Sequence, residues 1–296
     1  MKGLIISNYQ IGHNQYKIDR FKEEAINLGI SLDVIFNDGT LFTIDKDLVK
    51  ENIPECDFVI YLDKDIYLAY ALEQAGYKLY NSADFIRLCD DKALTVARCA
   101  NLGIDMPKTI TPPLVYSNEI DPKLFKTFLD HVEKELTYPL VGKLSYSSLG
   151  QGVYKIHNRE QLESFYLTNF KVPFLFQESV ETSFGRSVRV IIINEEIVGA
   201  IERINEKDYR SNVGENYSKI FEFDEKYLTF AKNLAKTLRI KYAGIDLLHG
   251  KNGPLLCEIN SNAFFEEFEK TTHINVAYKF LSYIVSDVGK AGLWRR

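Results

Sequence analysis

The first 80 residues alternate short apolar runs with segments whose apolar side chains recur at helical spacing. The runs are residues 3–8, 32–36 and 58–62, and the helical segments that follow the first and the third run end at Gly29 and Gly76, where glycine readily terminates a helix. This order constrains the fold strongly, because strands that are joined by helices pair in parallel. The sequence therefore predicts a small parallel α/β sheet.

Further helices and strands are predicted for the rest of the chain. Asp90 is the expected N-cap of a helix whose end precedes Gly103. Beyond Gly185, two long β segments that meet at residues 194–196 predict an antiparallel hairpin. Helices are expected at residues 82–89, 122–135, 159–169, 224–238 and 276–285, and further strands at 139–144, 152–156, 174–178, 188–194, 197–204, 242–248 and 254–259.

The charge balance excludes several classes of function. The 296 residues carry 36 Lys and Arg against 41 Asp and Glu, a net charge of -5, and so lack the basic excess that binding to a phosphate backbone needs. No apolar stretch reaches the roughly 18 residues that span a bilayer, and no basic region precedes an apolar one at the N-terminus. We therefore expect a cytoplasmic protein that binds neither nucleic acid nor a membrane.

Three oxygen-bearing side chains fall on two neighbouring predicted strands. Glu258 and Asn260 are two residues apart and share one face of their strand. If the preceding turn is centred on Asn252, Asp246 lies opposite Glu258. The chain has no CxxC pair and no HExxH motif, and an oxygen-only set suits Mg²⁺ or Mn²⁺ rather than zinc. The alternative is three solvated polar positions at a sheet edge.

A loop rich in serine and glycine follows Lys143. Residues 145–152 include two glycines, which let backbone amides approach an anion closely. A lysine beside such a loop suits a polyphosphate. The loop matches neither the Walker A nor the GxGxxG pattern, and an ordinary Ser/Gly hairpin turn is the alternative.

The order of these motifs resembles the ATP-grasp superfamily, and within it the RimK-like carboxylate–amine ligases that include glutathione synthetases and glutamate-adding enzymes. The likeness covers about residues 78 to 290. Its elements are Asp91-Lys92, residues 106–109, 138–153, Gln177-Glu178, 185–190, Arg203, 209–212, 243–246 and 257–262.

This resemblance implies a three-lobed α/β fold, with an N-terminal substrate-side domain at 1–90, a central ATP-grasp lobe at 91–180 and a C-terminal lobe with the metal site at 181–296. ATP would lie between the last two lobes. It also implies residue roles. Lys92, Lys143, Ser147, Ser148, Gly150, Gly152, Gln177 and Glu178 would bind ATP; Asp246, Glu258 and Asn260 would hold two Mg²⁺ or Mn²⁺ ions; and Arg189, Arg203, Arg210 and Asn212 would act on phosphates or on the carboxylate substrate, with surface salt bridges as the alternative.

The implied reaction activates a carboxylate as an acylphosphate and forms an amide with an amine, releasing ADP and phosphate. A kinase-like phosphotransferase and a non-catalytic nucleotide-binding module are the alternatives. The acid and amine are left open among amino acid, peptide, protein tail and natural-product intermediate, and a homo-oligomer is also left open. The loop at residues 7–14 is a candidate substrate contact because it follows the first strand; for His13 within it, an exposed loop histidine is the favoured alternative.

Two departures from the family pattern bear on the site. Ser187 stands where an aspartate is frequent, and Ala263-Phe264 stands where Pro-Gly is frequent. The first departure is expected to alter nucleotide contacts, and the second to reshape the wall beside the acceptor site. Neither removes a predicted metal ligand or phosphate-binding lysine, so we expect an active enzyme.

Overall fold

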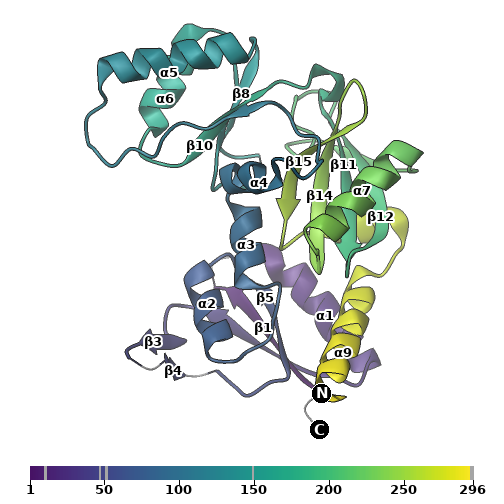
Figure 1. Cartoon of the computed structure of the whole chain (residues 1–296). Helices are drawn as coiled ribbons and strands as arrows, with labels where there is room; N and C mark the ends of the chain where they lie inside the picture. Colours follow the sequence, from purple (N-terminus) through teal and green to yellow (C-terminus); the bar gives the residue numbers. More distant parts are fainter. Residues whose placement is uncertain (10–11, 47, 51–52, 149, 294–296) are drawn as a thin grey trace.

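The computed structural model describes residues 1–9, 12–46, 48–50, 53–148 and 150–293. Three sheets form its framework, and they lie at the bottom, upper left and right of Figure 1. The first is parallel and has the order β2-β1-β5-β6, which confirms the predicted α/β start. Its strands are β1 (Lys2–Asn8), β2 (Ser31–Asn37), β5 (Phe58–Leu62) and β6 (Leu79–Tyr80), with a separate hairpin of β3 (Phe42–Ile44) and β4 (Leu48–Lys50).

Alternate side chains of the first sheet enter two different cores. Ile5 and Ile60 point toward α1 (Gln15–Asn27), which follows the single turn η1 (Gly12–Asn14). Leu4 and Val59 point toward α2 (Ile66–Gln74) on the other face. Every residue of β5 is buried as a result, because a strand covered on both faces has no solvent side.

Two short helices connect the first sheet to the rest of the chain. They are α3 (Ala83–Asp90) and α4 (Lys92–Cys99). The prediction that Asp90 caps the second helix is wrong by one residue. Asp91 is the cap, since its carboxylate accepts the backbone N–H of Leu94, whereas Asp90 ends α3 and forms an ion pair with Lys64.

The second sheet is antiparallel, has the order β7-β10-β8-β9 and carries its own aromatic core. Phe165, Phe174 and Phe176 pack together in that core. The predicted helices at 122–135 and 159–169 are confirmed, and each begins at a side-chain cap. The elements are β7 (Thr109–Ile110), α5 (Pro122–Glu135), β8 (Leu140–Leu144), β9 (Val153–Ile156), α6 (Arg159–Asn169) and β10 (Phe174–Glu178).

The third sheet is also antiparallel, with the order β13-β12-β11-β14-β15. The predicted hairpin is confirmed: its turn residues Asn194 and Glu195 both have positive φ, as tight two-residue hairpin turns require. The sequence interpretation missed β13 and α8. The elements are η2 (Glu181–Ser183), β11 (Arg186–Ile193), β12 (Glu196–Ile204), β13 (Tyr217–Ile220), α7 (Glu225–Thr237), β14 (Tyr242–His249), β15 (Pro254–Asn260), α8 (Glu266–Thr272) and α9 (Val276–Leu293).

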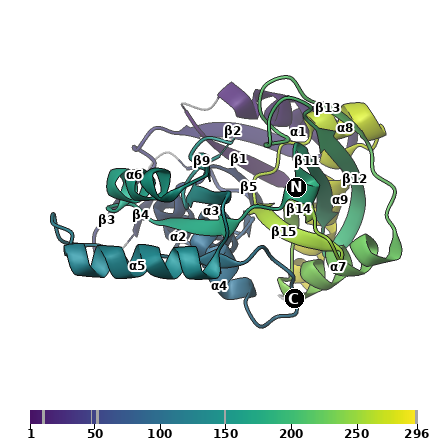
Figure 2. The ribbon, with the colours of Figure 1, turned by 90° about the horizontal axis from the view of Figure 1, so that it is seen from above.

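The first and third sheets share one hydrophobic core. Phe21 of α1 and Phe280 of α9 pack with Phe265 and Tyr242 of the C-terminal part, and α1 and α9 lie side by side in Figure 1. The second sheet projects away from this block, as Figure 2 also shows. The sheets fall within residues 1–90, 91–180 and 181–296, although the domain boundaries themselves stay a prediction. Across the described ranges, the helices are too short or too polar to cross a membrane.

A buried amide also ties the first and third sheets together. The side-chain nitrogen of Asn81 donates to the backbone carbonyls of Tyr242 and Ser261, at 2.8 Å each. Asn81 is 4% exposed, so water cannot replace these bonds at low cost.

We expect Asn81→Ala to lower the free energy of unfolding by about 3 kcal/mol, because two buried carbonyls lose their donor. Urea unfolding followed by circular dichroism measures the change. Asn233→Ala, at an exposed position of α7, is the matched control and should leave the midpoint within error. Equal midpoints for both variants would contradict the role of Asn81.

Candidate active site

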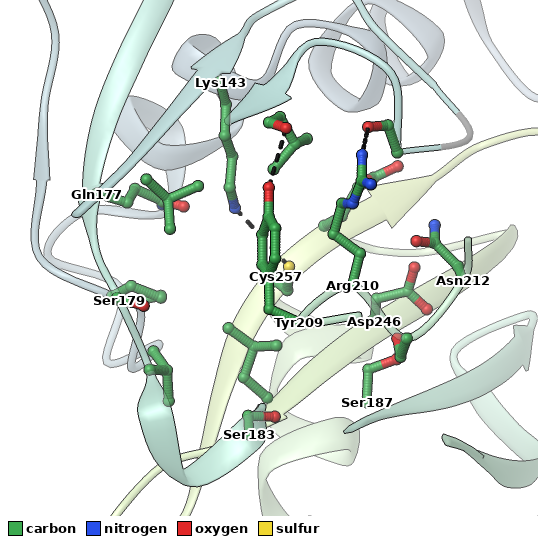
Figure 3. A pocket seen from close by; sticks show the side chains of 18 of the residues that line it. Lys143, Gln177, Ser179, Ser183, Ser187, Tyr209, Arg210, Asn212, Asp246 and Cys257 are labelled. Atoms are coloured by element: carbon green, nitrogen blue, oxygen red, sulfur yellow. Dashed lines mark hydrogen bonds between the residues drawn. The ribbon is translucent and has the colours of Figure 1, made fainter. Parts of the chain in front are cut away.

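Two adjoining cavities lie where the second and third sheets meet. The first cavity opens between β8 and β10 on one side and β11, β14 and β15 on the other (Figure 3). The second cavity, of about 520 Å³, continues toward the first sheet and α8. One wall is common to both cavities. It consists of Lys92, Ser147, Ser148, Gln151, Asn212, Asp246 and Glu258.

Gln177 and Glu178, which are both predicted to bind ATP, behave differently. The amide nitrogen of Gln177 donates to Thr109, and its buried oxygen has no hydrogen-bond partner among the described residues. That oxygen can accept a hydrogen bond from a ligand in the first cavity. The carboxylate of Glu178 instead accepts the backbone N–H of Lys108 at 2.9 Å, so it anchors the segment before β7.

The two predicted phosphate-binding lysines both line the first cavity. Lys143 lies on β8, and its amine is 3.9 Å from the sulfur of Cys257. Lys92, at the start of α4, donates to the backbone carbonyl of Ser147 at 2.5 Å. Burial, followed by repulsion from Lys143, lowers the pKa of Lys92, while Glu258 opposes the shift. Two neighbouring cationic amines of this kind favour an anionic ligand.

The loop at residues 145–152 needs its glycines. Gly150 and Gly152 have φ of 71° and 70°, a region that other residues rarely adopt. A Cβ atom at Gly150 would also clash with the side chain of Val213. Arg210 donates to the Gly150 carbonyl at 3.1 Å and pairs with Asp208, so this predicted catalytic arginine supports the loop from the third-sheet side.

The predicted pairing of Asp246 with Glu258 is confirmed, but the register of the hairpin that produces it differs from the prediction. Leu247 pairs with Leu256 and Asp246 with Glu258, so Cys257 is an extra residue in β15. Such a bulge changes the direction of the side chains beside it, and Cys257 and Glu258 both line the first cavity. The turn is therefore centred slightly before Asn252.

Two buried arginines surround Asp246. Arg189 donates to both of its carboxylate oxygens, at 2.5 and 2.7 Å, and Arg203 lies 3.6 Å away. Burial alone would raise the pKa of Asp246, but Arg189 and then Arg203 outweigh it and lower that pKa. Burial, and then repulsion from Arg189, lowers the pKa of Arg203. Asp246 is therefore matched by two positive charges in the wall of the second cavity.

The predicted metal ligands meet at one end of this cluster. The amide nitrogen of Asn260 donates to Glu258 Oε1 at 2.7 Å, and its oxygen accepts from Arg189 at 3.3 Å. Among the described residues, no group of three or more His, Cys, Asp or Glu side chains is arranged so that it could hold a metal ion. Two carboxylates and an amide are nevertheless a donor set that Mg²⁺ accepts.

The sequence interpretation missed residues that line the second cavity or support its wall from behind. Lys17 of α1 is buried, with its amine bonded to the side-chain and backbone oxygens of Asn262 and 4.4 Å from the Phe264 ring centroid. Glu267 of α8 forms an ion pair with Arg203 at 3.2 Å. The sequence predicts α1 as an amphipathic helix, but it does not predict the contact of α1 with a residue 245 positions away.

The two departures from the family pattern both line the cavities. Ser187 lies in the first cavity and bonds to Ser211 at 2.6 Å. Phe264 forms part of the wall of the second cavity. Of the predicted substrate loop, Asn14 reaches this cavity, whereas residues 10–11 and the side chain of His13 lie outside the described part of the chain.

Comparison with known proteins gives a consistent set of matches. Residues 89–284 match the model of the RimK-like ATP-grasp domain. The chain is 28% identical to the protein MG012 of Mycoplasma genitalium, over 87% of this chain and 91% of that protein. It is 31% identical to the probable alpha-L-glutamate ligase of Enterobacter sp. (strain 638), over 72% and 69%. The D-alanine–D-alanine ligase of Bacillus anthracis, solved with ATP, superposes with a TM-score of 0.72 at 17% identity and covers all of both chains.

We expect Lys143→Ala to abolish ADP formation and to weaken nucleotide binding by at least about 30-fold, because one charge-assisted contact to phosphate is lost. Thermal unfolding with and without Mg-ATP measures binding, since a ligand of the folded state raises its midpoint. Lys126→Ala, on the exposed face of α5, is the control and should keep the full shift. Normal turnover in Lys143→Ala would contradict this assignment.

Proposed function

Because the chain belongs to the RimK-like ATP-grasp family, we propose that it joins a substrate carboxylate to the amino group of an α-amino acid. It is an ATP-dependent ligase that forms C–N bonds, and the predicted ATP-grasp fold is confirmed. The observation that carries the proposal is the wall common to the two cavities. A nucleotide in the first cavity would present its phosphates at that wall, within reach of substrates in the second.

ATP fits the polar groups of the first cavity. The unpaired oxygen of Gln177 suits the amino group of adenine, and Lys92 with Lys143 suits the phosphates. The loop at 145–152 would cover the nucleotide, which supports exclusion of water from a reactive intermediate. Asp246, Glu258 and Asn260 would hold Mg²⁺, two ions in this proposal, and the ions would offset the negative charge of the phosphates.

The proposed reaction has two steps. A carboxylate oxygen attacks the γ-phosphorus, so that an acyl O–P bond forms and the bond from the γ-phosphorus to the β,γ-bridging oxygen breaks, which leaves an acylphosphate and ADP. The amine nitrogen then attacks the acyl carbon, a C–N bond forms, and phosphate departs with the C–O bond. Arg189 and Arg203 are placed beside the common wall, where they would steady the anionic groups of both steps.

An amino acid is the proposed amine because the second cavity places opposite charges side by side. Arg203 lies between the carboxylates of Asp246 and Glu267. A zwitterion carries its own carboxylate and ammonium at a similar spacing. The relative named as an alpha-L-glutamate ligase makes L-glutamate the first candidate.

Product analysis tests this proposal. The full chain is incubated with Mg-ATP, each of the α-amino acids, and one acid at a time from a panel of citrate, N-acetyl-L-glutamate and a peptide that ends in glutamate. We expect equal amounts of ADP and phosphate, and an amide detected by mass spectrometry, only when both an acid and an amine are present. A phosphorylated acceptor without an amide would indicate a phosphotransferase instead, and no ADP with any pair would indicate a binding module.

A further inference from the structure

We propose that Glu267 binds the ammonium group of the amine substrate and accepts its proton before the amine attacks. This inference rests on the proposed ligase function and adds a catalytic residue to it. An α-amino acid enters at neutral pH as an ammonium ion, which has no lone pair for attack. A ligase of this kind therefore needs a proton acceptor in the cavity that holds the amine.

Among the described residues that line the second cavity, four are carboxylates: Asp90, Asp246, Glu258 and Glu267. Asp90 is paired with Lys64, and Asp246 and Glu258 belong to the proposed metal set. Glu267 is left without a role in phosphate transfer, and its side chain is 39% exposed compared with 10% for Asp246. It is therefore the carboxylate best placed to meet an incoming cation.

The third sheet holds Glu267 in a defined orientation. Arg203 of β12 and Ser218 of β13 are direct cross-strand partners, and α8 lies beside these two strands in Figure 2. Arg203 donates to one oxygen of Glu267, and the Ser218 hydroxyl donates to the other. Each carboxylate oxygen can accept more than one hydrogen bond, so an ammonium group can still bind. A fixed acceptor of this kind lowers the cost of ordering the amine.

The neighbouring groups match the rest of an amino acid. Arg203 lies beside Glu267 and can receive the α-carboxylate, while the ring of Phe264 offers an apolar surface in the same cavity. Lys17 bonds to Asn262 and lies against the Phe264 ring, so α1 supports that wall from behind. The cavity therefore offers a small zwitterion a partner for its ammonium group, a partner for its carboxylate and an apolar surface.

The proposed step conserves protons and electrons. Glu267 takes one proton from the ammonium group, and the freed lone pair forms the C–N bond to the acyl carbon. As the C–O bond to phosphate breaks, the second proton on nitrogen leaves with the phosphate. The acylphosphate and ammonium ion become an amide, hydrogen phosphate and one proton, which Glu267 passes to solvent.

The test compares two nucleophiles on the same acylphosphate. Glu267→Gln keeps the shape of the side chain and removes its charge. Hydroxylamine is mostly uncharged at neutral pH, so it can trap the acylphosphate as a hydroxamate without first losing a proton. Each variant is assayed for amide formation with L-glutamate and for hydroxamate formation, using the acid from the panel that supports the fastest turnover.

We expect Glu267→Gln to lower amide formation about 100-fold, with a raised KM for the amino acid, and to keep hydroxamate formation within about two-fold of the parent chain. Glu267→Asp, which retains the charge, should recover part of the amide rate. Glu266→Gln is the matched control, because that side chain pairs with Lys270 on the exposed face of α8. It should leave both rates unchanged.

Two results would overturn this inference while leaving the ligase function intact. Amide formation at the parent rate in Glu267→Gln would remove any role for the carboxylate. A parallel loss of amide and hydroxamate would assign Glu267 to carboxylate activation, through Arg203, instead of to the amine. Failure of the parent chain to form either product would overturn the ligase proposal itself, and this inference with it.

Discussion

The hydrophobic core shared by the first and third sheets is the constraint on which the rest of the structure depends. Aromatic side chains of α1 and α9 pack against β14 and the segment after β15, so the two sheets form one block. Buried polar contacts fix their relative position. Asn81 bonds to the backbone of the third sheet, and Lys17 bonds to Asn262 just beyond β15. The second cavity is therefore built from two distant parts of the chain.

The second sheet stands apart because it has its own aromatic core. Its contributions to the site are Lys143, Gln177 and the loop at 145–152, which all face the third sheet across the first cavity. In the proposed reaction, the second sheet would supply groups for the nucleotide, and the block of the first and third sheets would supply groups for the metal and the acceptors. The reaction would then occur at the wall common to both cavities.

Much of the fold was predictable, because many elements carry strong local signals. The helices at 122–135 and 159–169 begin at Asp121 and Asn158, whose side chains cap them. The short α8 and the edge strand β13 were missed, since neither has a clear periodic pattern. Glu267 was missed for a related reason: its orientation depends on the cross-strand pair of Arg203 and Ser218, which no local pattern reveals.

By itself, the sequence determined most of the order of helices and strands, the family, and the residue types available for phosphate and metal, because these depend on short-range spacing. Tertiary structure decided which charges face each other. Asp246 meets Arg189 across 57 residues, and Lys17 meets Asn262 across 245. Contacts between such distant segments form only when packing of the sheets around a common core brings them together, and burial then makes each unpaired charge costly.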